Sequence, residues 1–335
     1  MRPILACGLV AALALPVVAN ASAAFEGQVR NRPWADRRVA ASPPVDLETI
    51  VPGARRRTES YGPSPDQAFD IYVPPNAANA PVLIMVHGGG WRTGDKAHPP
   101  VIANKLRYWL PRGYILVSVN YRLLPDAMAY EQAQDVAEAI RRISDQAPDW
   151  GGDAGALILM GHSAGAHLAA LLSARPEMVG RPVAGAVILD TAVLDVEAVM
   201  TRRHLPLYDN AFGADPANWR RASPADQWTP AATPMMIVCS TRRPDDPCAE
   251  ANAFARMTAG AGRQTPVLPV ALSHGEVNGD LGLPGDYTRA VDNFISERLA
   301  AMTYAGLECD WAAKIRRGVG YRPDRVPHPT FPDVG

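Results

Sequence analysis

The sequence lacks a large excess of charge of either sign, because its 33 basic residues are balanced by 34 acidic ones. A chain of this kind has no overall field to attract nucleic acid or a strongly charged substrate, so we expect no nucleic-acid partner. Internal repeats and low-complexity segments are also missing from its 335 residues. No set of His, Cys and Asp residues has the spacing of a metal site, and we expect no metal.

A hydrophobic run long enough to span a membrane comfortably is absent at the start of the chain. Arg2 precedes the apolar residues 4–18, and the small residues 21–23 (Ala-Ser-Ala) form a cleavage site before Ala24. We therefore expect residues 1–23 to be a signal peptide, and the mature protein to be periplasmic or secreted without stable membrane insertion. The alternative is an uncleaved anchor, for which the apolar run is short.

Cysteine is scarce, and its four positions are Cys7, Cys239, Cys248 and Cys309. Cleavage of the signal peptide would leave an odd number of them. Because an exported protein can form disulfides, we hypothesise a bridge between Cys239 and Cys248. That bridge would close a loop of about ten residues and hold residues 245–246 in place.

Apolar runs that alternate with helical patterns are the main feature of the rest of the chain. Strands are predicted over residues 67–73, 81–86, 114–119, 156–160, 183–189, 235–239 and 267–272. Helices are predicted over residues 103–110, 131–143, 164–174, 247–257 and 287–302. Such alternation predicts an α/β fold with a mostly parallel central sheet flanked by helices. We expect residues 24–335 to form one domain with a core over about residues 60–303.

Three segments lie outside this alternation. Residues 196–230 form an insertion rich in Pro, Trp, Tyr and Arg, which is typical of a lid or a structural cap. Residues 24–60 show no strong periodicity, and we interpret the basic run at residues 55–57 as a solvated face. Residues 305–335 contain Pro and Arg and are expected to form an extended C-terminal tail along the surface.

The strongest motif is Gly-His-Ser-Ala-Gly at residues 161–165, between an apolar run and a predicted helix. A strand that turns abruptly into a helix at Gly-x-Ser-x-Gly is a nucleophile elbow, which predicts Ser163 as the nucleophile. Such a short motif also occurs by chance, so the strand and helix around it carry the assignment.

A second motif, His-Gly-Gly-Gly-Trp at residues 87–91, follows the predicted strand 81–86. Consecutive glycines allow backbone N–H groups to point into a site and bind an oxyanion. We expect Gly89 and Gly90 to form this oxyanion hole together with Ala164, the residue after the nucleophile. The alternatives are a flexible turn or a phosphate-binding loop, although the Lys and Ser/Thr of a phosphate loop are missing.

A general base and an acid are expected after the last two predicted strands. His274 follows the strand 267–272, and a neutral imidazole accepts a serine proton near pH 7. The acid that orients His274 is expected after the strand 235–239, where Asp245 and Asp246 both lie. Either aspartate could instead cap the helix that follows. We favour Asp246 as the acid and keep Asp245 as the alternative.

The chain order Ser163, Asp246, His274 is that of α/β-hydrolases. Four motifs strengthen this resemblance: residues 87–91, 120–122 (Asn-Tyr-Arg), 161–165 and 273–276 (Ser-His-Gly-Glu). Together they resemble the esterase/lipase branch of that superfamily, and more narrowly the hormone-sensitive-lipase-like and feruloyl-esterase-like carboxylesterases. The resemblance implies an α/β-hydrolase fold and serine hydrolysis of a small-molecule ester without a cofactor.

We therefore expect an exported carboxylester hydrolase that forms an acyl-enzyme on small or aryl esters. Aromatic residues of the glycine loop and the insertion are candidates for the substrate pocket, and packing would explain them equally well: Trp91, Tyr208, Phe212, Trp219 and Trp228. An aryl formamidase or amidase is the second possibility, because that group has the same glycine loop with Trp. A hydrolase-fold binding protein without activity is the third.

Overall fold

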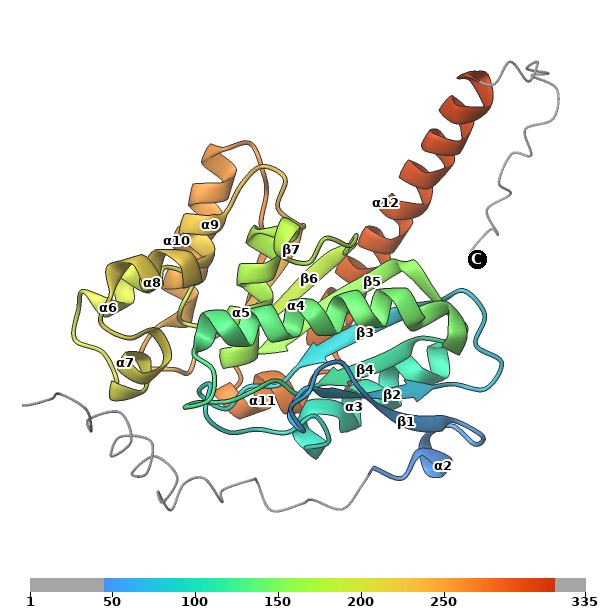
Figure 1. Ribbon diagram of the computed structural model, residues 1–335, viewed down its shortest axis with the longest axis horizontal. Helices are drawn as coiled ribbons and strands as arrows, with labels where there is room; N and C mark the ends of the chain where they lie inside the picture. The colour runs from blue at the N-terminus through green and yellow to red at the C-terminus, as the bar shows by residue number, and fades with distance from the viewer. Residues whose placement is uncertain (1–44, 317–335) are drawn as a thin grey trace, which may run out of the picture.

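Eight strands form one mixed sheet within residues 45–316, the part of the chain that this computed structural model describes (Figure 1). Their order is β1-β2-β4-β3-β5-β6-β7-β8. The strands are β1 (Arg55–Ser60), β2 (Ala68–Val73), β3 (Ala80–Val86), β4 (Ile115–Val119), β5 (Gly152–His162), β6 (Gly185–Leu189), β7 (Met235–Ser240) and β8 (Val267–Val270). β2 is antiparallel to both β1 and β4, and the other pairs are parallel. The predicted α/β fold is confirmed.

The central strands are apolar on both sides, as strands covered by helices on both faces must be. In β3, Val82, Ile84 and Val86 belong to a hydrophobic cluster on one face of the sheet. Leu83 and Met85, which alternate with them, belong to a second cluster on the opposite face. The continuous apolar runs in the sequence therefore correspond to strands inside the sheet.

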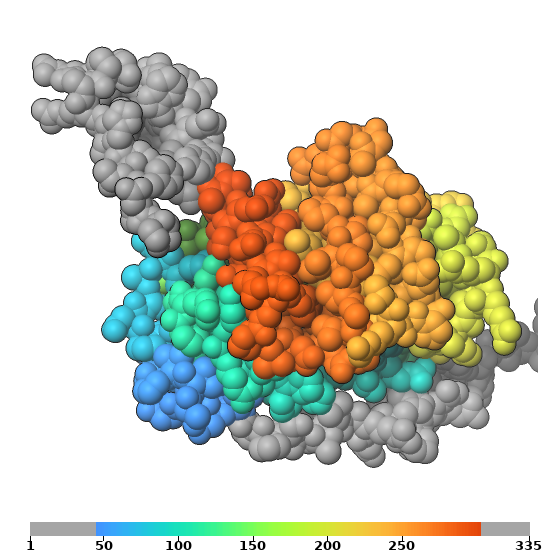
Figure 2. Space-filling view, turned by 180° about the vertical axis from the view of Figure 1, so that it is seen from behind, coloured from blue at the N-terminus to red at the C-terminus, as the bar shows by residue number. Residues whose placement is uncertain are grey.

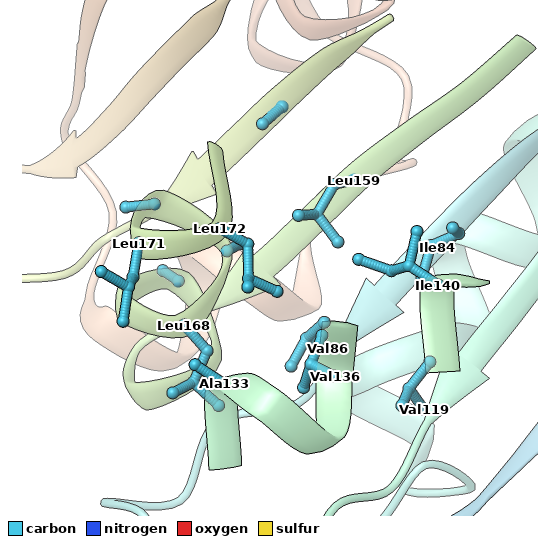
Figure 3. Close-up of a cluster of buried hydrophobic side chains, with 14 of the residues drawn as sticks. Ile84, Val86, Val119, Ala133, Val136, Ile140, Leu159, Leu168, Leu171 and Leu172 are labelled. Carbon is cyan, nitrogen blue, oxygen red and sulfur yellow. The ribbon is translucent and has the colours of Figure 1, made fainter. Parts of the chain in front are cut away.

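Helices α4 (Ala129–Gln146) and α5 (Ala164–Ala174) cover the first face. Their apolar side chains recur every three or four residues and are buried in the cluster between the two helices and the sheet (Figure 3). From α4 these are Ala133, Val136 and Ile140, and from α5 they are Leu168, Leu171 and Leu172. This packing places the first turn of α5 directly above the end of β5.

Helices α3 (Pro99–Trp109), α11 (His274–Gly279) and α12 (Asp286–Arg316) lie on the second face, which Figure 2 shows from behind. Ile102 and Leu106 of α3 and Val291 and Ile295 of α12 are buried in its cluster. The indole Nε1 of Trp109 donates a 2.9 Å hydrogen bond to Asp292, which ties α3 to α12. Val277 of α11 is buried in the same cluster, and its carbonyl oxygen accepts a 2.6 Å hydrogen bond from the hydroxyl of Tyr287 in α12.

The residues 196–230 form an insertion between β6 and β7, as predicted. It contains α6 (Val196–Met200), α7 (Pro206–Phe212), α8 (Pro216–Ala222) and α9 (Pro224–Gln227). A proline opens each of the last three helices, where its missing N–H costs no hydrogen bond. The apolar residues of the insertion, among them Val196, Phe212 and Ala222, are buried in the first-face cluster. The insertion is a cap packed onto α4 and α5.

The basic run at residues 55–57 is exposed, as expected, whereas the expectation of an extended tail from residue 305 is wrong. The basic run at residues 55–57 is part of the edge strand β1, where Arg56 forms a 2.6 Å ion pair with the buried Asp70 of β2. Every side chain of β1 is polar, so the sequence shows no apolar and polar alternation that would predict a strand there. Antiparallel pairing with β2 holds β1 in the sheet. The tail expected from residue 305 is helical as far as Arg316, because α12 meets no proline there, and residues 317–335 lie outside the described part.

α10 (Pro247–Gly260) completes the helices that matter for the site, and it packs beside β7 on the first face. A short helix α2 (Leu47–Ile50) precedes β1. Among the described helices, none combines the length and the apolar character needed to cross a bilayer.

A lysine is buried where α3 meets α11. Lys105 is 1% exposed, and its Nζ donates to the main-chain oxygen and to Oδ1 of Asn278, at 2.7 and 2.9 Å. The neighbouring Asn104 donates a 2.6 Å hydrogen bond to the carbonyl oxygen of Gly279. α3 therefore holds the C-terminal end of the helix that begins with His274. Burial lowers the pKa of Lys105 to about 7.

The variant Lys105→Met should flatten the pH dependence of stability. A lysine in the unfolded chain titrates near 10.5, so between pH 7 and 10.5 unfolding takes up a proton and the free energy of unfolding rises with pH. Urea denaturation at pH 7 and pH 9 should show a rise that is smaller in the variant by about 2 kcal/mol. Equal rises in the two proteins would show that Lys105 does not titrate in this range.

Candidate active site

The end of β5 turns abruptly into α5 at Ser163. Ser163 has φ 57° and ψ −119°, a backbone conformation that is strained for a residue with a side chain. Its N–H donates to the carbonyl oxygen of Leu189 in β6, and its carbonyl oxygen accepts from His167 one turn into α5. The strain is thus held by hydrogen bonds on both sides, and the sharp strand-to-helix turn predicted at residues 161–165 is confirmed.

Two glycines permit this turn because a side chain would not fit at either position. A Cβ atom at Gly161 would lie 2.2 Å from the carbonyl oxygen of Gly165. A Cβ atom at Gly165 would lie 2.4 Å from the carbonyl oxygens of Val86 and His87. α5 therefore passes close to both β5 and the end of β3, which brings the loop after β3 against Ser163.

His274 stands at the first position of α11, and its Nε2 lies 2.9 Å from Ser163 Oγ. Ser273 and Glu276 form a capping box that fixes the start of this helix. His162, the neighbour of the serine, holds the loop from the other side. Its ring lies 4.5 Å from that of His274, and its Nε2 is 2.8 Å from the main-chain oxygen of His274. Burial lowers the pKa of His162 to about 3, so it is neutral and donates from Nε2.

The carboxylate that faces His274 is Asp190, the residue after β6. Its Oδ2 lies 2.6 Å from His274 Nδ1, and its Oδ1 accepts a 2.8 Å hydrogen bond from the N–H of Ser240. Asp190 is wholly buried. Burial alone would raise the pKa of this carboxyl, but the hydrogen bonds from His274, from Ser240 and from Arg243 hold the pKa below its ordinary value. Asp190 is therefore ionised at neutral pH.

The prediction that Asp246 or Asp245 faces His274 is wrong. Asp246 caps α10, where its side chain accepts a 3.1 Å hydrogen bond from the N–H of Ala249. Asp245 pairs with Arg243. Both side chains are therefore occupied, while Asp190 at the carboxyl end of the neighbouring strand reaches the imidazole. The signal for it was present, because Asp190 is the first polar residue after the predicted strand 183–189.

The predicted disulfide joins Cys239 at the end of β7 to Cys248 in the first turn of α10. It closes the loop that carries the two aspartates of the wrong prediction. The bridge therefore fixes the position of this loop next to Asp190.

The glycine loop after β3 lies directly beside Ser163. A Cβ atom at Gly88 would lie 2.9 Å from the Cβ of Ser163. Gly89 and Gly90 have φ 124° and 61°, values that favour glycine. Within residues 45–316, the N–H groups of Gly89, Gly90 and Ala164 donate to no other protein atom. They are thus free to bind an anion, as the oxyanion prediction requires.

His87, at the start of this loop, supports the loop and does not face the substrate side. Its ring stacks on Tyr121 at 4.5 Å, and the hydroxyl of Tyr121 donates a 2.8 Å hydrogen bond to the main-chain oxygen of His87. Burial lowers the pKa of His87, which keeps the ring neutral. Within the described residues, no three His, Cys, Asp or Glu side chains are grouped so as to hold a metal ion.

Comparison with known proteins relates this site to esterases. Residues 69–202 match the protein family BD-FAE. A probable isoprenylcysteine alpha-carbonyl methylesterase of Arabidopsis thaliana is 34% identical over 116 residues, which are 34% of this chain and 24% of that protein. Esterase LipQ of Mycobacterium tuberculosis is 29% identical over 240 residues, which are 64% of this chain and 56% of that protein. The chain thus spans between about a quarter and just over half of these curated relatives.

Solved structures share the fold. A truncated carbohydrate esterase from gut microbiota has a TM-score of 0.65 at 19% identity, covering 77% of this chain and 99% of that one. Esterase 2 of Thermogutta terrifontis has a TM-score of 0.60 at 22% identity, covering 73% of this chain and 92% of that one. The chain is thus similar in part of its sequence to BD-FAE proteins and other esterases, and it shares the α/β-hydrolase fold of the solved esterases. The resemblance seen in the sequence is therefore confirmed.

Aromatic side chains gather behind the glycine loop. The ring of Trp91 lies 5.8 Å from Tyr208, 5.1 Å from Phe212 and 5.6 Å from His167. Trp91 itself is only 3% exposed. Three of the five candidate pocket residues, Trp91, Tyr208 and Phe212, thus lie together at the junction of the glycine loop, α5 and the insertion.

The structure does not bring Trp228 to Ser163. Trp228 follows α9, and the nearby Thr233 donates a 2.8 Å hydrogen bond to the carbonyl oxygen of Ser173, near the C-terminal end of α5. Ser163 precedes the other end of α5, about 15 Å away along the helix axis. Gln227, the neighbour of Trp228, accepts a 3.1 Å hydrogen bond from Arg175 at the C-terminal end of α5. Trp228 therefore packs on the first-face cluster away from Ser163. Trp219 also packs on this cluster, and it donates to the carbonyl oxygen of Gly213.

The variant Gly165→Ala should be strongly destabilised, because its methyl group would overlap two main-chain oxygens. We expect a loss of about 3 kcal/mol or more in the free energy of unfolding, measured by urea denaturation. Gly260→Ala is the matched control, since no atom lies within 4 Å of its Cβ position at the end of α10. The control should change stability by less than about 1 kcal/mol. Similar losses in the two variants would contradict the close approach of α5 to β3.

Proposed function

We propose that this protein is a serine carboxylester hydrolase that works through an acyl-enzyme. The observation that carries the proposal is the continuous contact from Asp190 through His274 to Ser163, with distances of 2.6 and 2.9 Å. Such an arrangement of carboxylate, imidazole and hydroxyl serves one chemical purpose well, which is to make the hydroxyl oxygen nucleophilic. The esterase relatives support the same reading.

The proposed reaction begins when His274 Nε2 takes the proton from Ser163 Oγ as this oxygen attacks the ester carbonyl carbon. The carbonyl oxygen becomes an oxyanion, for which the free N–H groups of Gly89, Gly90 and Ala164 are the donors. Asp190 stabilises the imidazolium through Nδ1. The imidazolium then returns its proton to the leaving alcohol oxygen, and the C–O bond breaks. Water, activated by His274 in the same way, releases the acid and restores Ser163.

Small or aryl esters are the substrates we propose. Among structural neighbours, esterase 2 of Thermogutta terrifontis binds propionate and butyrate, which are short acyl groups. The curated relatives include methylesterases. Beside the glycine loop, the half-buried ring of Tyr208 packs against the buried Trp91 and Phe212, and its exposed part is an apolar, aromatic surface. An acyl group of a few carbons, or an aryl group, would suit such a surface.

We further propose that the protein is exported to the periplasm or secreted. Residues 1–23 have the charge, the apolar run and the small residues of a signal peptide, and they lie outside the described residues. The disulfide between Cys239 and Cys248 fits an oxidising compartment. The test is cell fractionation followed by mass spectrometry of the amino terminus. A mature chain that starts at Ala24 outside the cytoplasm supports export, and an intact cytoplasmic chain with free thiols contradicts it.

Two aspartate variants test the proposed function most directly. Asp190→Asn should lower kcat for p-nitrophenyl butyrate by about 10³- to 10⁴-fold, because an amide can present N–H to Nδ1 and so favour the wrong tautomer of His274. Asp246→Asn should stay within a few-fold of the wild type, since an asparagine caps a helix almost as well as an aspartate. Ser163→Ala should abolish both turnover and labelling by a fluorophosphonate.

The opposite ranking of the two aspartate variants would refute the assignment of Asp190. A wild-type protein that hydrolyses neither p-nitrophenyl esters nor an N-formyl aryl amine, and that no fluorophosphonate labels, would refute the proposed hydrolase function itself. Faster turnover of the amide than of the matched ester would make the protein an amidase on the same site.

A further inference from the structure

Arg243, in the loop between β7 and α10, touches both the acid and the base of the site. Its Nη1 lies 3.0 Å from Asp190 Oδ2, 3.0 Å from the main-chain oxygen of Asp190 and 3.0 Å from His274 Nδ1. The side chain of Arg243 is 18% exposed, so water screens its charge only weakly. A permanent cation is therefore in contact with two of the three residues to which we assign the chemistry.

The protons can be placed from the donors and acceptors alone. Nη1 carries two hydrogen atoms, and Asp190 offers two acceptors, its carboxylate and its main-chain oxygen. Both hydrogens of Nη1 are thus donated to Asp190. His274 Nδ1 keeps its own proton and donates it to Asp190 Oδ2 at 2.6 Å. Arg243 therefore holds Asp190 at two points without taking the place of the imidazole.

Asp245, the alternative acid of the sequence analysis, holds Arg243 in turn. Its Oδ1 accepts a 2.9 Å hydrogen bond from Nε of Arg243, and its Oδ2 accepts a second one from Nη2. This two-pronged pairing fixes the plane of the guanidinium as well as its position. The disulfide after β7 and the Asp246 cap fix the two ends of the same loop.

The charges of this group balance when the imidazole is protonated. Asp190 and Asp245 are negative and Arg243 is positive, so the three together carry one negative charge. An imidazolium at His274 would bring the sum to zero. Without Asp245, the positive charge of Arg243 would repel the imidazolium of His274 and disfavour its protonation. Without Arg243, the two carboxylates would attract the imidazolium and favour its protonation too strongly.

We propose that Arg243, held by Asp245, is a positioning residue that keeps the Asp190 carboxylate aligned on His274. The inference rests on the proposed ester hydrolysis and adds to it the loop after β7. In this arrangement the acid comes from the end of β6, and the loop after β7 supplies a guanidinium to support it. Arg243 acts through Asp190 and does not touch the reacting ester.

The surroundings of His274 define what else could influence its protonation. Asp190 comes from the end of β6, Arg243 and Asp245 from the loop after β7, and His162 from the elbow. The exposed ion pair between Arg242 and Glu276 flanks the start of α11, and the buried Lys105 lies behind its end. Of these, Asp190 and Arg243 contact Nδ1 directly.

The experiment compares Arg243→Met with Arg242→Met, using p-nitrophenyl butyrate. Arg242 is the matched control, because it is the adjacent arginine, is 59% exposed and pairs with Glu276 at 3.5 Å. We expect Arg243→Met to lower kcat by about 10- to 100-fold with KM within about threefold, since misplacing a catalytic group costs this much. Arg242→Met should stay within about twofold of the wild type. Arg243→Lys should recover only part of the loss, because an ammonium cannot bind Asp190 and Asp245 with the same fork.

The pH profile distinguishes positioning from a general loss of structure. The acidic limb of kcat/KM reports protonation of the base in the free enzyme. Removing the cation in Arg243→Met makes protonation easier, so the limb should move to higher pH by about one unit. Removing the anion in Asp245→Asn should move the limb to lower pH. Thermal unfolding of each variant shows whether it is folded.

The inference is supported if the acidic limb shifts in opposite directions in folded Arg243→Met and folded Asp245→Asn. It also requires that kcat falls in both variants and falls further in Arg243→Met. A folded Arg243→Met with the kcat and pH profile of Arg242→Met overturns it. If Arg243→Met does not fold, an unshifted profile in Asp245→Asn overturns it instead. The wild type is measured first. If it shows neither turnover nor fluorophosphonate labelling, the proposed hydrolase function is refuted, and the role of Arg243 is a separate question.

Discussion

A buried negative charge at Asp190 governs how the site is built. A carboxylate that is wholly shielded from water must find its hydrogen bonds within the protein. Asp190 finds them in the imidazole of His274, the N–H of Ser240 and the guanidinium of Arg243. These partners come from different segments, so the carboxylate is satisfied only when β6, β7 and α11 are in their correct places. The contacts that satisfy the buried carboxylate of Asp190 thus also fix the geometry of the site.

The strain at Ser163 depends on the same arrangement. Its N–H is bound by Leu189, the residue immediately before Asp190, so the elbow and the acid are tied through β6. The glycines at 161 and 165 allow α5 to come close enough to β3 for the glycine loop to face the hydroxyl. Each part of the site is positioned by a strand of the parallel region at its carboxyl end, where such sheets place their ligands.

The local motifs of the sequence predicted the sharp turn at Ser163, the glycine loop beside it and the approach of His274, because each is defined by a few adjacent residues next to an apolar strand. Asp190, the carboxylate that contacts His274, was missed because an aspartate after a strand can have several structural roles. Asp246 satisfies the pattern for an acid and the pattern for a helix cap equally well, and only the helix-capping geometry is realised. Choosing Asp190 requires knowing that β6 and β8 bring their ends to one place, which no local pattern states. Trp228 was misplaced for the same reason, since its distance from Ser163 depends on how α9 packs along α5.

The two edge strands of the sheet, β1 and β8, affect how easily the protein aggregates. β1 ends the sheet with a row of arginines, and charged side chains on an outer strand discourage a second chain from adding to it. β8 ends the other side after only four residues, one of which is Pro269 and has no N–H to offer. A second chain therefore cannot pair easily with either edge strand. We expect the protein to resist aggregation through intermolecular β-sheets even at high concentration.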